Sequence, residues 1–278
     1  TVYTQPGSGN IIGGTGIAIK LWGHTAEEMM IPGTEEMKFA LGENPKRFHG
    51  LEQHRMPWTR MGTAALLRET LYKAKNYSDK LKAAETDPSK APEPDFKLDA
   101  LVRVIRGEQR VRIHCHRADD IITAIRIAKE FGLDFTLEHA TEGYKVRDVI
   151  AENHLYCIVG PLLLPPSKQE IWNLKLENPG MLTDAGVKVC LTADTGSETK
   201  WLPMQAGLLL RRGMTEENIM KGLTIYPAEV LNLDHRIGSL EEGKDADVAV
   251  FDGNPLYNTT LCRMTMIDGE VVYSTLDE

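Results

Sequence analysis

The sequence predicts an α/β fold in which strands alternate with helices, followed by a short all-β segment at the C-terminal end. Short apolar runs such as "VRIH" (111–114) are followed by longer runs with apolar residues three or four positions apart. Strand–helix repeats of this kind are typical of parallel βα units. From about Leu231 the helical pattern stops, and short β runs with glycine turns follow. We therefore predict a βα-barrel domain over residues 1–230 and a small β domain over residues 231–278.

Seven apolar runs are expected to form the strands of the large domain, at 1–4, 16–21, 36–43, 111–114, 134–140, 155–161 and 187–196. Helices are expected at 61–77, 98–107, 118–131, 143–153, 201–213 and 215–233. Two of them have clear core faces, with Ala64, Leu67, Leu71 and Ala74 in the first and Ala118, Ile121, Ile122, Ile125 and Ala128 in the third. Gly132 is expected to end the third helix. The charged, proline-rich stretch 78–97 predicts an exposed excursion, and within it residues 82–96 favour a flexible surface insertion over a lid.

The composition limits the classes of partner. A net charge of -8 argues against a nucleic-acid or anionic-membrane binder, because both partners attract a basic face. The apolar runs are shorter than the ~20 residues of a membrane span. Four cysteines are widely spaced without a CxxC pair, which predicts reduced thiols in the cytoplasm. We expect a cytoplasmic protein with a small-molecule substrate. We expect no nucleic-acid or membrane partner, and the sequence leaves homo-oligomerisation open.

Four polar residues lie at the ends of predicted strands, where a parallel barrel forms its active face: Lys38, His114, His139 and Asp194. Each residue alone also has an ordinary interpretation, as a hydrogen-bonded histidine, a turn-forming aspartate or a snorkelling lysine. Together, two imidazoles and a carboxylate can supply nitrogen and oxygen ligands to one divalent metal ion.

Other residues near these strand ends are weaker candidates for metal ligands. His116 has the same strand parity as His114 but lies in the turn before the next helix, which favours His114. Glu142 and His154 are further alternatives, and His154 is expected to be a solvated helix cap.

Three stretches carry a resemblance to a known family: "IHCHRADDIITAIRIAKEFGLDFTLEHA" (113–140), "LTADTG" (191–196) and "GLTIYPAEVLNLDHRIGSLEEGKDADVAVFDGNP" (222–255). The last stretch is the most specific. On these motifs the chain resembles the metal-dependent amidohydrolase superfamily, in particular its imidazolonepropionase-like and prolidase-like branch. The resemblance implies a distorted (β/α)8 TIM-like barrel and part of a small composite β-sandwich.

The resemblance also implies a ligand set. It assigns a carboxylated Lys38 to the fourth barrel strand, His114 to the fifth, His139 to the sixth and Asp194 to the eighth. Glu43 is the rival on the fourth strand, because some branches use a glutamate there. Strand parity favours Lys38, since the small residues Ala40 and Gly42 share its face and the bulky residues take the other.

The chain departs from the family pattern at its start. The family places an HxH pair on the first barrel strand, but His24 stands alone upstream of Lys38. Counted against the family, "TVYT" (1–4) corresponds to the second barrel strand. We therefore expect the first strand and the N-terminal half of the β-sandwich to lie outside this chain.

The implied activity is cleavage of a C–N bond in an amide or cyclic amide by metal-activated water. The expected metal is zinc, with iron and manganese as alternatives and one or two ions. Asp194 would move the proton to the leaving nitrogen, and His139 with the metal would stabilise the oxyanion. His116 and Arg60, or Arg55 instead, are candidates for substrate binding.

Two alternative functions stay open at this point. One is a deaminase of the same superfamily, which would use one metal and no carboxylated lysine. The other is a non-catalytic, structural relative. Because the HxH pair is absent, the chain taken alone could also be inactive.

Overall fold

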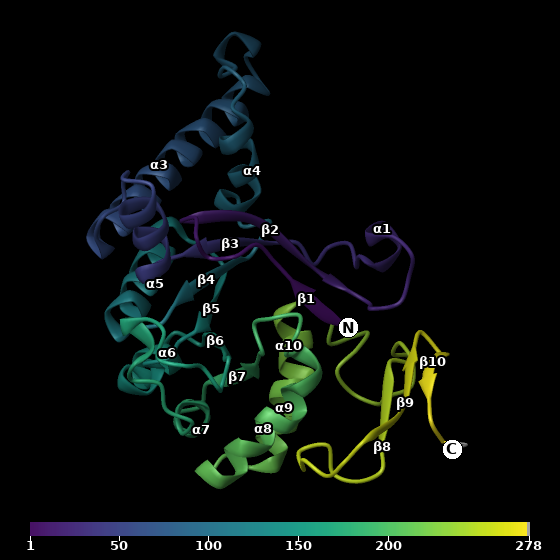
Figure 1. Cartoon of the computed structure of the whole chain (residues 1–278). Helices are drawn as coiled ribbons and strands as arrows, with labels where there is room; N and C mark the ends of the chain where they lie inside the picture. The colour runs from purple at the N-terminus through teal and green to yellow at the C-terminus, as the bar shows by residue number, and fades with distance from the viewer. Residues whose placement is uncertain (277–278) are drawn as a thin grey trace. The chain divides into compact units, whose positions relative to one another are not determined.

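The computed structural model describes residues 1–276. Seven strands form one sheet whose order follows the chain (Figure 1). They are β1 (Val2–Thr4), β2 (Ile12–Ile19), β3 (Glu36–Ala40), β4 (Val111–Cys115), β5 (Phe135–His139), β6 (Tyr156–Val159) and β7 (Lys188–Leu191). Each predicted strand run overlaps one of them, although β2 begins at Ile12, four residues before its predicted run, and β4 ends at Cys115, one residue after its run. A sheet in which chain neighbours are also sheet neighbours is the arrangement of a βα barrel, so the predicted α/β barrel class is confirmed.

The expectation that all of these strands are parallel was wrong for the first two. β1 pairs with β2 in antiparallel register, Tyr3 opposite Ala18, and β2 pairs with β3 in antiparallel register, Thr15 opposite Met37. The segment between β1 and β2 spans residues 5–11 only, and a parallel crossover needs about a dozen residues or more. The pairs β3/β4 and β6/β7 are parallel as predicted.

The chain divides into two compact units. The first unit contains residues 5–16 and 35–137, and the second contains residues 1–4, 17–34 and 138 onward. The domain boundary that the sequence suggests near Leu231 stays a prediction.

Helices cover the strands of the first unit. They are α2 (Glu43–Lys46), the π-helical turn Arg47–Glu52, α3 (Arg60–Ala84), α4 (Phe96–Ile105) and α5 (Ala118–Phe131). The predicted core face of α3 is buried as expected. In α5, Ile121, Ile125 and Ala128 are buried, but Ile122 is 38% exposed. Ile122 lies at the border of the apolar stripe, and Ile127 fills the core instead. Gly132 ends α5 with φ 65°, as predicted.

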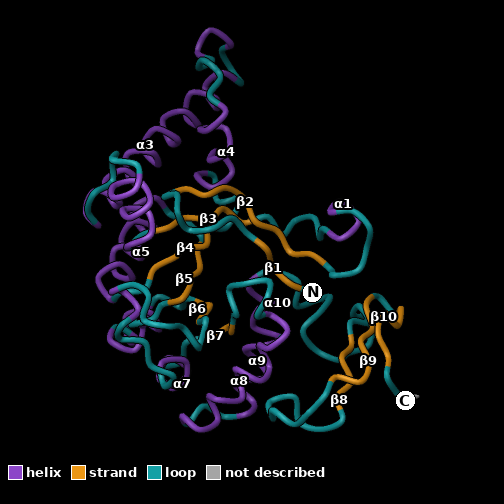
Figure 2. Tube along the Cα trace, viewed as in Figure 1, coloured by secondary structure: helices purple, strands orange, loops and turns teal. Residues whose placement is uncertain are grey.

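The predicted insertion at 78–97 is more helical than expected. α3 continues to Ala84 and α4 starts at Phe96, so the two helices form a hairpin with a short connection (Figure 2). The residues over 78–84 are charged but include good helix formers, and an exposed helix face tolerates charge. The Tyr77 hydroxyl donates to Asp99 at 2.8 Å and joins the two helices.

The second unit contains α1 (Ala26–Met29), α6 (Arg147–Glu152), α7 (Asn178–Asp184), α8 (Leu202–Gly207), α9 (Glu216–Leu223) and α10 (Ile225–Val230). The single helix predicted over 215–233 is broken at Thr224, which has φ -126° and ψ -84°. Pro227 has no N–H to donate, so it is tolerated in the first turn of a new helix and not inside a longer one.

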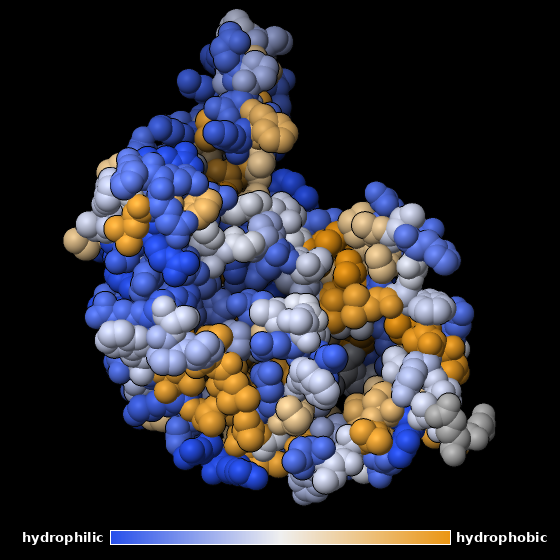
Figure 3. Space-filling model, viewed as in Figure 1, coloured by the Kyte–Doolittle hydropathy of each residue, from blue (hydrophilic) through white to orange (hydrophobic). Residues whose placement is uncertain are grey.

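The C-terminal β segment forms an antiparallel sheet in the order β10–β9–β8, with β8 (Val248–Phe251), β9 (Cys262–Ile267) and β10 (Glu270–Ser274). Every residue of these three strands is at least partly exposed. Leu21, Trp22 and Tyr273 are among the large apolar and aromatic side chains of the second unit that are exposed. Figure 3 shows hydrophobic surface, in orange, among hydrophilic surface, in blue. Among the described residues 1–276, no helix is both long and apolar enough to cross a membrane.

Candidate metal centre

One face of the β3/β4 pair carries polar side chains. The register places Lys38 beside Arg112 and Ala40 beside His114, and neighbouring residues of parallel strands project to the same face. The opposite face carries Met37, Phe39 and their β4 neighbours, which pack in the core. Lys38 and His114 therefore lie on one face, and both are almost fully buried, with 2% and 3% exposure.

An ion pair stabilises the polar face at its N-terminal end. Arg112 donates to Glu36, and both side chains are buried. Burial raises the pKa of Glu36, and the positive charge of Arg112 opposes that rise. The charges of Glu36 and Arg112 compensate one another, so Lys38 is not needed to neutralise either of them.

His114 and His116 lie at the C-terminal end of β4. Their rings are 4.7 Å apart between centroids and nearly perpendicular, and His116 is as buried as His114. The side-chain amide of Asn44, in α2, lies 3.3 Å from Nε2 of His114 and donates to the Ser8 hydroxyl at 2.7 Å. With the amide turned over, Oδ1 would instead accept from Nε2–H and from Ser8. In that orientation Nε2 is protonated, and Nδ1 is the nitrogen that can bind a metal.

His139 ends β5 in a different way. It has φ 66°, and its Nδ1 lies 2.6 Å from the carbonyl oxygen of Gly160 at the end of β6. Metal-binding histidines commonly donate their second ring N–H to a backbone carbonyl in this way, which sets the tautomer and the ring orientation. Nε2 of His139 is then the potential metal ligand.

Gly160 is required at that position by its surroundings. Its φ is 145°, and an added Cβ would overlap the carbonyl oxygen of Thr192, which follows β7. Thr192 N–H in turn donates to Val159 at 3.0 Å. The partner of His139 is therefore a backbone group that close packing of two strand ends holds in place.

One group of potential metal ligands was found among the described residues 1–276, and it consists of His114, His116 and His139. His114 and His116 belong to the first unit and His139 to the second, and all three side chains are buried. Buried neutral imidazoles are suited to zinc, iron and related ions, so this donor set fits the metal that the sequence predicts. His116, which the sequence placed in the turn, belongs to the group.

The remaining predicted residues lie outside that group of histidines. Asp194 is exposed just after β7, with φ 59° and its N–H donating to Thr192 at 3.1 Å. Glu43 is partly buried at the start of α2. Arg60 forms an ion pair with the buried Asp120. Their roles stay predictions.

The structure also describes the two weaker candidates for metal ligands, Glu142 and His154. Glu142 is buried and accepts from Lys145 at 2.6 Å and from Asn173 at 2.5 Å. His154 has φ 53° between α6 and β6. Neither belongs to the group of histidines.

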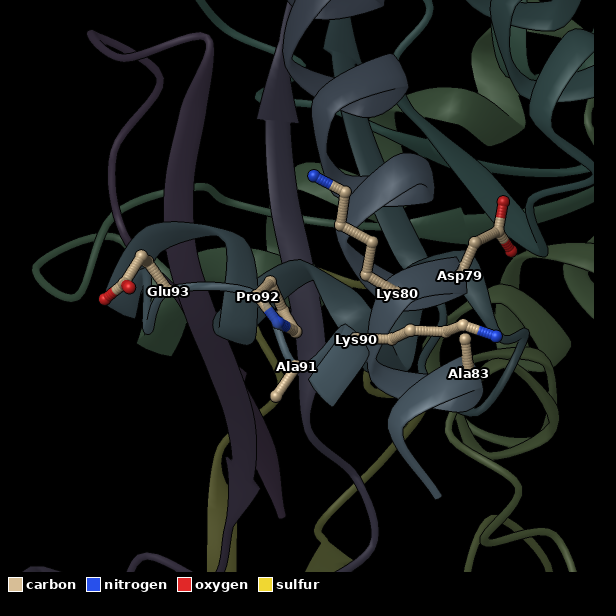
Figure 4. Close-up of a pocket in the computed structure, with 7 residues that line it drawn as sticks. All are labelled: Asp79, Lys80, Ala83, Lys90, Ala91, Pro92 and Glu93. Carbon is tan, nitrogen blue, oxygen red and sulfur yellow. The ribbon is translucent and has the colours of Figure 1, made fainter. Parts of the chain in front are cut away.

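The sequence analysis missed the residues that orient the histidines, Asn44 and Gly160. Asn44 stands just beyond the predicted strand 36–43, and Gly160 stands near the end of the predicted strand 155–161, so position at a strand end was the available signal. A small pocket beside His139 is lined by Gly160, Pro161 and Asn178, among others. A more open pocket at the α3–α4 hairpin is lined by Asp79, Lys80, Lys90 and Glu93 (Figure 4) and contains none of the predicted site residues.

Two curated proteins are similar to this chain. An amidohydrolase tasK from Hapsidospora irregularis is 25% identical over 95% of this chain and 29% of its own length. An imidazolonepropionase from Geobacillus sp. (strain WCH70) is 39% identical over 28% of this chain and 19% of its own length. The matched regions thus span less than a third of either relative.

A solved structure and a family match extend over much more of the chain. The crystal structure of an amidohydrolase from Thermotoga maritima MSB8 superimposes with a TM-score of 0.93 at 40% identity, covering 98% of this chain and 71% of that one. Residues 65–272, well over half of the chain, match the amidohydrolase family. The chain belongs to the amidohydrolase family.

Proposed function

We propose that the chain is part of a metal-dependent hydrolase that cleaves a C–N bond in a small-molecule amide or cyclic amide. The observation that carries the proposal is the buried group of histidines at the ends of β4 and β5 in a member of this family. A bound divalent ion would supply a water that is acidic enough to act as a nucleophile near neutral pH. Zinc is our first choice because imidazole nitrogen is among its preferred ligands, with iron and manganese as alternatives.

Four residues would hold the metal ion or transfer the proton. His139 would hold the ion through Nε2, because the Gly160 carbonyl accepts from its Nδ1. His114 would hold it through Nδ1 with the Asn44 amide turned over, so that Oδ1 accepts from Nε2–H. Lys38, carboxylated, would add an anionic ligand from the same face of the sheet as His114. Asp194 would take the proton of the attacking water and pass it to the leaving nitrogen.

Two further residues are proposed to contact the substrate. The ring of His116 packs against that of His114 and could contact the substrate or the ion. Arg60 would have to bind the substrate while it remains paired with Asp120.

The test is the metal content of the full chain purified without added metal, measured by elemental mass spectrometry. We expect about one or two equivalents of a divalent transition metal. His139→Ala should lose most of it, because it removes a ligand of the buried group. His154→Asn is the matched control, since asparagine tolerates the positive φ of His154 and that residue lies outside the group.

Two results would contradict the proposal. One is a metal-free wild-type chain that also fails to take up added Zn²⁺. The other is bound metal that survives in His139→Ala but is lost in His154→Asn. If metal is bound, hydrolysis of amides and cyclic amides is the next assay.

A further inference from the structure

The end of β5 is a strained turn centred on a proposed metal ligand. Ala140 N–H donates to the carbonyl of Glu138 at 2.9 Å, two residues back, and His139 between them has φ 66°. This is a γ-turn with positive φ, a rare conformation. Ala140 also has positive φ, 40°. Left-handed conformations at two successive non-glycine residues persist only where the surroundings hold them.

The turn replaces regular strand geometry at His139. In a regular strand His139 would share the face of Leu137, which is fully buried in the core. The γ-turn interrupts this alternation at His139, the residue whose Nδ1 contacts the Gly160 carbonyl. The position of the imidazole therefore depends on keeping the turn formed.

Asn178, at the start of α7, clamps the segment that follows. Its Nδ2 donates to the carbonyl of Ala140 at 3.0 Å, and its Oδ1 accepts from Tyr144 N–H at 2.8 Å. The Ala140 carbonyl also accepts from Gly143 N–H at 2.7 Å. Asn178 is 2% exposed, so water does not compete for these bonds.

The geometry around Asn178 demands an amide of this size. One end of the side chain must donate and the other must accept, which an aspartate, a leucine or an alanine cannot do. A Cβ added at Gly143 would lie 3.4 Å from Oδ1 of Asn178 and 3.3 Å from Leu182. The loop is therefore packed closely against the side chain that holds it.

We propose that Asn178 is a positioning residue for the metal site: it holds the γ-turn at His139 and so presents the imidazole for metal binding. The role of the metal in this inference rests on the proposed function, whereas the hydrogen bonds of Asn178 come from the structure. Asn178 acts through its side-chain hydrogen bonds to the backbone of Ala140 and Tyr144. Its expected effect is therefore on metal affinity and on the order of the loop, with no direct part in the reaction.

The test compares Asn178→Asp with Asn153→Asp in the full chain. Asn178→Asp keeps the shape and the acceptor but loses the donor to Ala140. Asn153→Asp is the matched control, because Nδ2 of Asn153 donates to the carbonyl of Val149 at 2.6 Å in the same unit, away from the turn. The measurements are the Zn²⁺ dissociation constant, by competition with a chromophoric chelator, and amide hydrogen exchange of the metal-free proteins.

We expect Asn178→Asp to weaken Zn²⁺ binding about 10–100-fold, as is typical for residues that orient a metal ligand. In the metal-free protein it should speed exchange over residues 138–146. Asn153→Asp should leave Zn²⁺ affinity within about twofold of the wild type. Adding Ala140→Gly to Asn178→Asp should recover part of the affinity, because glycine adopts positive φ without strain.

The outcomes separate this inference from the proposed function. Unchanged Zn²⁺ affinity in a folded Asn178→Asp variant would overturn the inference, and so would equal losses in both variants. If Asn178→Asp does not fold, Asn178→Ser, which retains a small donor, replaces it and is judged by the same two measurements. A wild-type chain that binds no Zn²⁺ overturns the proposed function and the positioning role with it, while the exchange data still report whether Asn178 holds the turn.

Discussion

At the scale of single residues, Lys38 decides between two kinds of metal site. It is buried on β3 on the same face as His114, and Glu43 lies a few residues further on at the start of α2. We expect Lys38→Ala to lower the metal content by about one equivalent and to abolish amide hydrolysis, because a second ion needs a bridging anion. Glu43→Gln should change both values little. Elemental mass spectrometry and an amide-hydrolysis assay on the two variants make the comparison.

A different result for Lys38 would favour another enzyme class. If Lys38→Ala keeps its metal and its activity, a one-metal site without a carboxylated lysine is supported, and the deaminase alternative should be assayed next. If Glu43→Gln is the variant that loses metal, Glu43 takes the place of Lys38 as the ligand.

The two histidines that we propose as metal ligands differ in how far the sequence could predict them. His114 lies on a regular strand, so its face follows from the alternation of "VRIH" and from the parity of β3. His139 could be placed at a strand end, but its direction depends on a γ-turn that contacts from Asn178 support. The contact from Asn178 to Ala140 spans 38 residues of sequence, and no local pattern in "FTLEHA" indicates it.

At the scale of elements, the ends of β6 and β7 pack too closely for any side chain at Gly160. We expect Gly160→Ala to lower the free energy of unfolding by about 2–4 kcal/mol, because Cβ would overlap the Thr192 carbonyl. Gly186→Ala is the control: it also has positive φ, 88°, but nothing lies within 4 Å of an added Cβ. That control should cost about 1 kcal/mol. Urea unfolding at pH 7 measures both, and equal losses would refute the steric argument.

The errors in predicting elements have common physical causes. Helix cores such as that of α3 follow from apolar spacing, and strands follow from short apolar runs. Strand direction does not follow from such runs, and β1 and β2 were misread as parallel because the length of the link between them was not used. The extension of α3 to Ala84 was missed because a charged helix surface resembles a loop in composition.

At the scale of the whole molecule, one buried lysine joins segments that are more than 200 residues apart. Lys20 follows β2, is 7% exposed, and donates to Asp245 at 2.8 Å, to Asp247 at 3.0 Å and to Asp268. These contacts tie the 17–34 segment to the C-terminal sheet region within the second unit. Burial disfavours the charges of Lys20, Asp245 and Asp247, but the hydrogen bonds that these groups form raise the pKa of Lys20 and lower the pKa of Asp245 and Asp247.

The directions of these shifts set the pH range in which the cluster stabilises the fold. The pKa of Asp245 and Asp247 is lowered by folding, so their contribution is complete above the unfolded value of about 4 and is lost as the pH falls through the folded values. The pKa of Lys20 is raised, so its contribution is complete below about 10 and is lost only as the pH rises through its folded value. The cluster should therefore stabilise the chain evenly from about pH 4 to pH 10.

Replacing Lys20 tests this argument. We expect Lys20→Met to lower the free energy of unfolding by about 2–3 kcal/mol at pH 7, because it removes the buried cation from two partly buried carboxylates, of which Asp245 keeps a second cationic partner, Arg236. The difference from the wild type should shrink at pH 3, where the carboxylates start to take up protons. Lys188→Met is the control, since Lys188 pairs with Glu229 but is about half exposed, and it should cost less than about 1 kcal/mol. Urea unfolding at pH 3, 5 and 7 measures these values. If Lys20→Met lowers the free energy of unfolding equally at pH 3 and pH 7, packing of the lysine stem, and not its charge, joins the two segments.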